Sequence, residues 1–245
     1  MSSGSFSSFT QTPVLDTLRH PLRRLWQRNG HAAHQLYSGS TIGHGEPILV
    51  FPMFGAGPES TLRLRAALDQ AGFVSYDWGR GVDNGPPPGG FANLLRELED
   101  RVVDVFETER CGLTLLGWGL SGIYARELAK RTAPLVRQVI TLGTPFNTAG
   151  GRCDMLSPLH DESGSLPSGL AQQLREAPPV PSTSIYSLSD VKVPWPMCLD
   201  TESLASENIL VPAATHEQLA NTPKVRDVVT DRLMQPEDGW RPFAV

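Results

Sequence analysis

The sequence has no apolar run long enough to cross a bilayer. Its first 13 residues, rich in serine and threonine, contain no hydrophobic segment typical of a secretion signal. We therefore expect a cytoplasmic protein without an integral membrane segment. Basic residues are in the minority: the chain has 21 Lys and Arg and 26 Asp and Glu, which gives a formal net charge of −5. That balance gives no reason to expect nucleic acid as a partner.

Cysteine and histidine are also scarce. The three cysteines show no CxxC spacing. A Cys153–Cys198 disulfide is disfavoured in a reducing compartment, and Cys111 is interpreted as a small packing residue. His31 and His34 offer at most two metal ligands with no third in sequence reach. We therefore expect no metal site and no cofactor.

What the sequence does contain is an alternation of apolar runs and amphipathic segments over 245 residues. This pattern predicts an α/β domain with a mostly parallel central sheet and helices on both faces. Glycine (23) and proline (21) are frequent, so many tight turns should join these elements. The predicted strands are 47–51, 73–78, 113–117, 136–142, 183–187 and 208–211, and the main predicted helices are 59–72, 91–109, 123–131 and 223–234.

Two segments depart from the alternation. Residues 1–45 are interpreted as an N-terminal extension, partly disordered, with one short helix within 14–28. Residues 46–245 form the predicted domain, and the polar, glycine-rich stretch at about 147–180 is interpreted as a small lid. Leu156, Leu159 and Leu166 either line an apolar channel under that lid or simply pack it.

The stretch GWGLSG (117–122) follows an apolar strand and precedes a helix. Strand, glycine-rich turn and helix in this order are the setting of a nucleophile elbow, whose pattern is G-x-S-x-G. Here the central position is Gly119, and the serine stands two residues later at Ser121. Position 121 lies about 200° further around the helix axis, where strand and helix backbones are expected to pass closely. We therefore expect Ser121 to cap or pack rather than attack, although a displaced nucleophile stays open.

Ligands of open α/β sheets bind outside the carboxyl ends of the strands. The residues that follow the predicted strands there are Met53 and Phe54, the GWGLSG turn, Asp190 and His216. Turn, acid and histidine come in the chain order of an α/β-hydrolase triad. This order predicts that Asp190 contacts the His216 ring beside Gly119.

Longer stretches carry a resemblance to a known family. They are LTLLGWGLSGIYARELAKRTAPLVRQVITLGTPF (113–146), IYSLSDVKVPW (185–195), SENILVPAATH (206–216), PMFGAG (52–57) and GWRPF (239–243). With them the chain resembles the α/β-hydrolase superfamily, in particular a bacterial esterase/lipase-like branch, with Gly119 in place of the nucleophilic serine. The resemblance extends from about residue 46 to the end of the chain.

The resemblance implies roles for individual residues. His216 would be the general base, Asp190 would orient it, and the backbone N–H groups of Leu120 and Phe54 would form an oxyanion hole. Trp118 and Met53 would flank the substrate. Met53 replaces a glycine that is usual in the oxyanion loop, and Glu217, beside the histidine, is an unusual neighbour that could alter the protonation of the imidazole.

Several functions stay open on this evidence. The first is an enzyme that uses the Asp–His pair and the oxyanion hole without a covalent intermediate. It would catalyse proton transfer, cyclisation, elimination or water-mediated hydrolysis of a small apolar carbonyl or acyl compound. The second is a catalytically inactive homologue that binds a ligand or acts as a scaffold. The third is a serine esterase or lipase whose nucleophile is displaced or has been replaced by an introduced substitution.

Overall fold

The computed structural model describes residues 42–243, apart from 168, 202, 213 and 237–238. The helix predicted within 14–28 therefore lies outside the described residues. The strands are β1 (Pro47–Phe51), β2 (Val74–Asp77), β3 (Leu113–Trp118), β4 (Val136–Leu142), β5 (Ser182–Tyr186) and β6 (Ser206–Leu210). The α-helices are α1 (Leu62–Gln70), α2 (Gly90–Glu109), α3 (Leu120–Arg131), α4 (Leu170–Arg175) and α5 (Pro223–Leu233), and 3₁₀ helices include η4 (Thr148–Gly150), η5 (Asp154–Leu159) and η7 (His216–Asn221).

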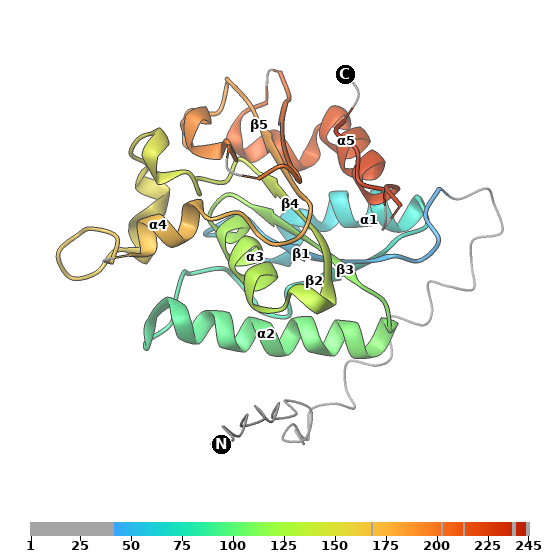
Figure 1. The fold of residues 1–245 in the computed structure, drawn as a ribbon, viewed down its shortest axis with the longest axis horizontal. Coiled ribbons are helices and arrows are strands. Elements are labelled where there is room, and N and C mark those ends of the chain that lie inside the picture. The colour runs from blue at the N-terminus through green and yellow to red at the C-terminus, as the bar shows by residue number, and fades with distance from the viewer. Residues whose placement is uncertain (1–41, 168, 202, 213, 237–238, 244–245) are drawn as a thin grey trace, which may run out of the picture. The chain divides into compact units, whose positions relative to one another are not determined.

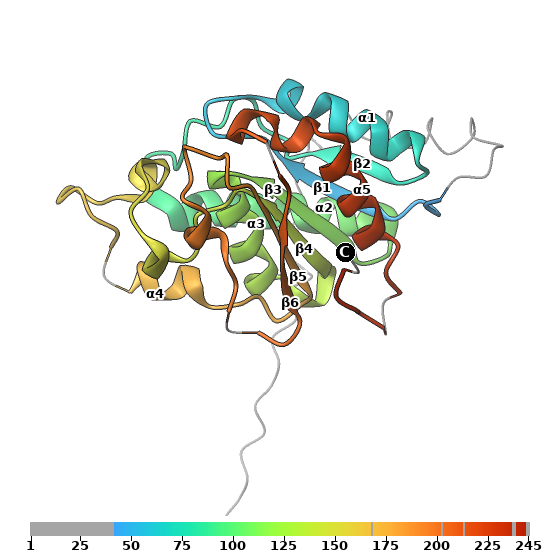
Figure 2. The same ribbon diagram turned by 90° about the horizontal axis from the view of Figure 1, so that it is seen from above.

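The six strands form one parallel sheet in the order β2-β1-β3-β4-β5-β6, which can be followed in Figure 2. Each predicted strand is present, with boundaries that differ by at most two residues. The predicted α/β architecture is confirmed.

Helices cover both faces of the sheet, with α2 and α3 on one side and α1 and α5 on the other (Figure 1). Successive side chains of a strand point to opposite faces. In β1, Leu49 and Phe51 accordingly pack into the core with α2 and α3, whereas Ile48 and Val50 pack into the core with α1 and α5. Because both faces are buried, the strand reads as a continuous apolar run rather than an alternating one.

The register of the sheet brings the loops that follow four strands to one edge. Phe51 at the end of β1 is opposite Gly117 in β3, and Trp118 at the end of β3 is opposite Leu142 in β4. Leu142 in turn is opposite Ile185 in β5. The loops after β1, β3, β4 and β5 therefore begin side by side, at the edge where open α/β sheets bind ligands.

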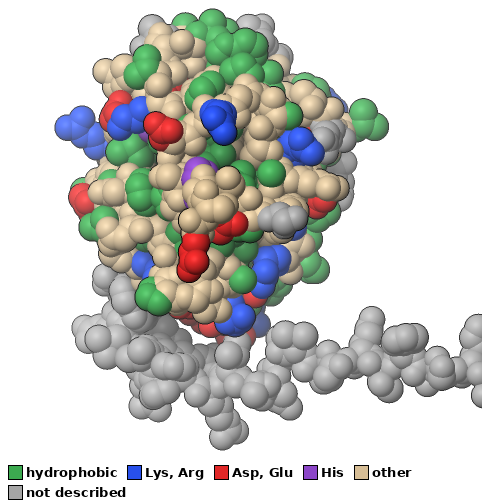
Figure 3. Space-filling model, turned by 90° about the vertical axis from the view of Figure 1, so that its left-hand side faces the viewer, with side chains coloured by type: hydrophobic (Ala, Val, Ile, Leu, Met, Phe, Trp, Pro, Cys, Tyr) green, Lys and Arg blue, Asp and Glu red, His purple; other side chains and the backbone are tan. Residues whose placement is uncertain are grey.

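The stretch predicted as a lid contains η4, η5 and α4. Leu156 and Leu159 are buried in the core with α2 and α3, and Leu166 packs against that core. Of the two explanations for these leucines, the structure therefore supports packing. On the face that carries α4, acidic, basic and apolar side chains are interspersed (Figure 3).

Two further observations concern the sequence predictions. Cys111 is exposed in the turn before β3, so its interpretation as a packing residue is wrong. No helix in the described part of the chain combines the length and hydropathy needed to cross a membrane.

Candidate active site

The turn between β3 and α3 has the backbone of a nucleophile elbow. Gly119 has φ 64° and ψ −126°, a conformation that glycine adopts freely and other residues adopt only with strain. Its N–H donates to the carbonyl oxygen of Leu142 in the neighbouring strand, with an N···O distance of 2.8 Å. The sharp turn expected at this position is thus present, with a glycine at its apex.

Ser121 is fully buried, and its hydroxyl group has partners away from the histidine. It donates to the carbonyl oxygen of Pro52 at 2.5 Å and accepts from the N–H of Trp118 at 3.3 Å. This hydroxyl ties the start of α3 to the loop after β1. The arrangement supports the packing interpretation of Ser121.

The close approach of strand and helix falls on different residues from the one expected. A Cβ atom on Gly117 would collide with the backbone of Gly122, so these two glycines allow β3 and α3 to touch. The expectation that position 121 is the point of closest approach is therefore wrong. Position 121 has room for a small polar side chain because the contact lies one residue further along.

Asp190 and His216 form the hydrogen bond that the sequence predicts. Oδ2 of Asp190 lies 2.7 Å from Nδ1 of His216. The other carboxylate oxygen accepts from the backbone N–H groups of Lys192 and Val193, both at 2.9 Å. A carboxylate held in this way accepts from an Nδ1–H group, so Nε2 of the neutral ring carries the free lone pair.

Nε2 of His216 points toward the missing side chain. A Cβ atom on Gly119 would lie 2.8 Å from Nε2 and 3.1 Å from Sδ of Met155. Among the described residues, Nε2 is buried without a hydrogen-bond partner, and the whole residue is 1% exposed. Nε2 therefore faces the empty side-chain position of Gly119 and has no contact with solvent.

Two neighbours fix the backbone and the space around this pair. The indole Nε1–H of Trp118 donates to the carbonyl oxygen of His216 at 3.0 Å, which holds the start of η7 against the elbow. Gly143, with φ 53°, lies behind the pair, where a Cβ atom would sit 2.9 Å from Oδ2 of Asp190. Glycine at 143 thus leaves the room in which Asp190 and His216 meet. The sequence offered no signal for this role beyond a glycine at the end of a strand.

Glu217, the residue after the histidine, forms an ion pair at the protein surface. Its carboxylate pairs with the ammonium group of Lys192, with a nitrogen–oxygen distance of 2.5 Å, and both side chains are about half exposed. The hydrogen bond from Lys192 lowers the pKa of Glu217 to about 2. The pair joins the loop of Asp190 to the loop of His216 at the protein surface.

The loop that carries Met53 and Phe54 is held by a residue that sequence reasoning missed. The Gly55 N–H donates to the carbonyl oxygen of Asp83 at 2.8 Å, and the Asp83 N–H donates to the carbonyl oxygen of Ala56 at 3.0 Å. The Asp83 side chain is fully buried, and its Oδ2 lacks a hydrogen-bond partner among the described residues. Burial raises the pKa of Asp83 to about 6. A single aspartate in a glycine- and proline-rich loop does not reveal such a role.

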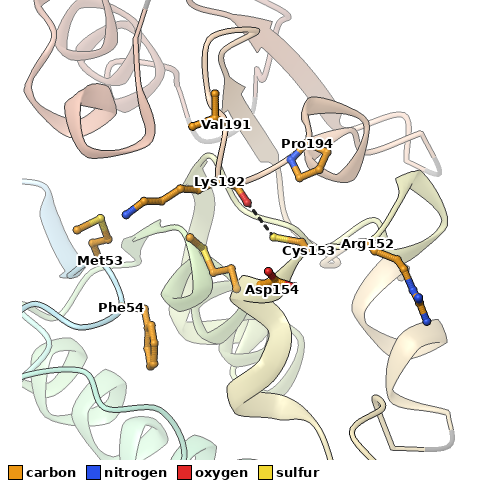
Figure 4. Close-up of a pocket in the computed structure, with 9 residues that line it drawn as sticks. Met53, Phe54, Arg152, Cys153, Asp154, Val191, Lys192 and Pro194 are labelled. Carbon is orange, nitrogen blue, oxygen red and sulfur yellow. Dashed lines mark hydrogen bonds between the residues drawn. The ribbon is translucent and has the colours of Figure 1, made fainter.

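A pocket of about 530 Å³ opens beside this loop (Figure 4). Three stretches of chain form its walls: the loop after β1, the start of the segment that leads into η5, and the loop after Asp190. Lys192 extends toward Met53, and the thiol group of Cys153 donates a hydrogen bond to the carbonyl oxygen of Lys192, with an S···O distance of 3.2 Å. The lining residues are Met53, Phe54, Arg152, Cys153, Asp154, Met155, Val191, Lys192 and Pro194.

Of the predicted site residues, only Met53 and Phe54 line this pocket. Gly119, Asp190 and His216 lie together behind it, and Met155 is the lining residue whose side chain reaches them. The lining residues 152–155 come from a polar stretch with no motif, which is why the sequence did not single them out.

The similarity of this chain to known proteins lies in its fold. No family model and no curated protein matches the sequence. Solved structures do match. A metagenome-derived lipolytic enzyme is 14% identical with a TM-score of 0.56, over 78% of this chain and 93% of that one. A monoacylglycerol lipase of Paleococcus ferrophilus is 15% identical with a TM-score of 0.54, over 78% and 96%.

The chain has the α/β-hydrolase fold. A bromoperoxidase of Bacillus anthracis also matches, at 15% identity and a TM-score of 0.53, over 78% of this chain and 92% of that one. Proteins named for different reactions thus share this architecture. The chemistry of this chain must therefore be argued from its own site residues.

Proposed function

We propose that this chain is an α/β-hydrolase-like enzyme that uses His216 as a general base without forming a covalent intermediate. The observation that carries the proposal is the orientation of the imidazole. Asp190 holds Nδ1, two backbone amides hold Asp190, and Nε2 faces the vacant side-chain position of Gly119. Base and orienting acid are kept together, although the acyl-enzyme route is closed.

The proposed substrate is a small apolar carbonyl or acyl compound. In the reaction, Nε2 takes a proton from the carbon next to the carbonyl group or from an attacking water molecule. Asp190 stabilises the imidazolium that forms, and the proton is returned to the product or the leaving group in the second half of the reaction. The backbone N–H groups of Phe54 and Leu120 are the proposed donors to the developing oxyanion. Met53, Phe54, Val191 and Pro194 offer apolar surface to such a substrate, and Arg152, Asp154 and Lys192 add charged groups to the same pocket.

The test is turnover of a panel of short and medium acyl esters, thioesters and lactones by the unmodified protein and by His216→Gln. Glutamine keeps much of the volume but removes the base. We expect a loss of about 10²- to 10⁴-fold in the variant, the usual contribution of a general base. We also expect no burst and no covalent adduct by intact-mass spectrometry. Equal turnover by both proteins would contradict the proposal.

A second candidate function is ligand binding without catalysis. It is favoured by the complete burial of Nε2 and by the position of Met155, whose Sδ lies next to the vacant site. The pocket would then bind an apolar ligand in front of Met155. This candidate predicts no turnover of the panel, together with ligand affinities by titration calorimetry that are the same for the unmodified protein and for His216→Gln.

A further inference from the structure

The side chain of Met155 touches both the pocket and the vacant position at Gly119. It is one of the residues that line the pocket. Its Sδ lies 3.1 Å from the place that a Cβ atom on Gly119 would occupy, and that place is 2.8 Å from Nε2 of His216. The thioether therefore lies close to where a side chain at position 119 would be, and the same residue lines the pocket.

The burial of His216 is consistent with this position. Nε2 is a polar atom that has neither solvent contact nor a hydrogen-bond partner in the described part of the chain. Buried polar atoms without partners are uncommon and costly. The missing partner of Nε2 is explained if a ligand can reach this nitrogen only after another group has moved.

The side chain of Met155 can move while its backbone stays in place. It is partly exposed at the second position of η5, and the backbone of this helix is anchored by Leu156 and Leu159, which are both buried. Methionine is unbranched and has three rotatable side-chain bonds, so it changes rotamer at low cost. Rotation of this side chain would free the space beside Nε2 while η5 keeps its contacts with the core.

We propose that Met155 is a gate between the pocket and the imidazole, and that its side chain must rotate before a ligand in the pocket reaches Nε2 of His216. The gate rests on the proposed function in one respect: the ligand that passes Met155 is the proposed substrate, and the group that it reaches is the proposed base. It also sets specificity, because a group that cannot displace the thioether stays in the outer pocket.

The experiment measures access to the imidazole rather than turnover. The folded proteins are treated with diethyl pyrocarbonate, and modification of each histidine is followed over time by peptide mass spectrometry. His44, which is exposed, is the internal reference for full reactivity. In the unmodified protein we expect His216 to react at least about tenfold more slowly than His44, because a buried group reacts only through opening.

The variants then test Met155 itself. We expect Met155→Ala to raise the rate at His216 by about tenfold, toward that of an open site. Met155→Leu, which keeps the bulk, should leave the rate low. Met53→Ala is the matched control, because it shortens another partly buried methionine of the same pocket. If Met155→Ala does not keep the native melting temperature, Met155→Val gives the same comparison with less lost volume.

Two results would overturn the gate. One is a rate at His216 in the unmodified protein equal to that at His44. The other is an unchanged rate at His216 in a folded Met155→Ala or Met155→Val variant. Neither readout depends on turnover. The two proposals can therefore fail separately. If Met155→Ala makes His216 reactive but the protein turns over no substrate, the gate stands and the proposed function does not.

Discussion

Replacing Gly119 with serine would place a hydroxyl group beside Nε2 of His216, in an elbow whose backbone already has the required shape. The new Cβ atom would lie 2.8 Å from Nε2, which is closer than such contacts are found, and 3.1 Å from Sδ of Met155. The ring is tied to Asp190, whereas the thioether can rotate. We therefore expect Met155 to turn away and the ring to shift by a few tenths of an ångström.

The substitution should lower stability while it raises activity. A serine at φ 64° carries a strain of about 1–3 kcal/mol. A hydrogen bond from its hydroxyl group to Nε2 returns only about 1 kcal/mol. A net cost of about 1 kcal/mol lowers the melting temperature of a chain of this length by roughly 2–4 °C. Because serine, histidine and acid act as a unit, ester hydrolysis should rise by about 10³-fold or more.

The assay combines hydrolysis of a short acyl ester, thermal unfolding, and intact-mass spectrometry after treatment with a serine-directed phosphonate. Gly119→Ala is the matched control, because it has the same backbone strain and the same Cβ atom but no hydroxyl group. We expect a phosphonate adduct on Gly119→Ser alone. The unmodified protein and Gly119→Ala should remain unlabelled.

Two results would refute this reasoning. Labelling of the unmodified protein that vanishes in Ser121→Ala would show that the nucleophile has moved two residues along the chain. A folded Gly119→Ser protein that is neither labelled nor active would show that the oxyanion donors are not available. Crowding of that loop by Met53 would be the first cause to test.

Three further predictions concern single residues. Ser121→Ala should lower the free energy of unfolding by about 1–3 kcal/mol, because the buried carbonyl of Pro52 loses its donor, as measured by urea unfolding. Gly143→Ala should push a methyl group against Asp190 and remove the downfield Nδ1 proton resonance of His216, and an unchanged resonance would contradict it. Asp83 has a folded pKa of about 6 against an ordinary value of 3.8, so its protonated form stabilises the fold. That contribution is complete below about pH 4 and lost as the pH rises through about 6, for about 3 kcal/mol in all. In Asp83→Asn it should be absent, so the stability difference between variant and unmodified protein should change over this range.

The elements of the fold could be predicted because their signals are local. The apolar run at 47–51 and the amphipathic segment at 91–109 each identify their element without knowledge of the rest of the chain. The contact between Asp190 and His216 was also predictable, because carboxyl ends of parallel strands share one edge. The catalytic roles of these residues stay predictions.

The pocket could not be predicted in the same way. Arg152, Cys153 and Met155 come from a stretch without periodicity, and their position depends on how Leu156 and Leu159 pack into the core. Asp83 is a comparable case, since its burial results from tertiary contacts that no local pattern encodes. For Cys111, a local pattern was misleading: the apolar strand next to it suggested burial, whereas the residue is exposed.

The pair of Lys192 and Glu217 has a consequence for how the site responds to its surroundings. The pair is half exposed and links the two loops that carry the acid and the histidine, while the Asp190–His216 contact beneath it is shielded from solvent. Dissolved ions weaken attraction between exposed charges far more than between buried ones. Rising ionic strength should therefore loosen the tie between these two loops at the surface, while the buried hydrogen bond between Asp190 and His216 is retained.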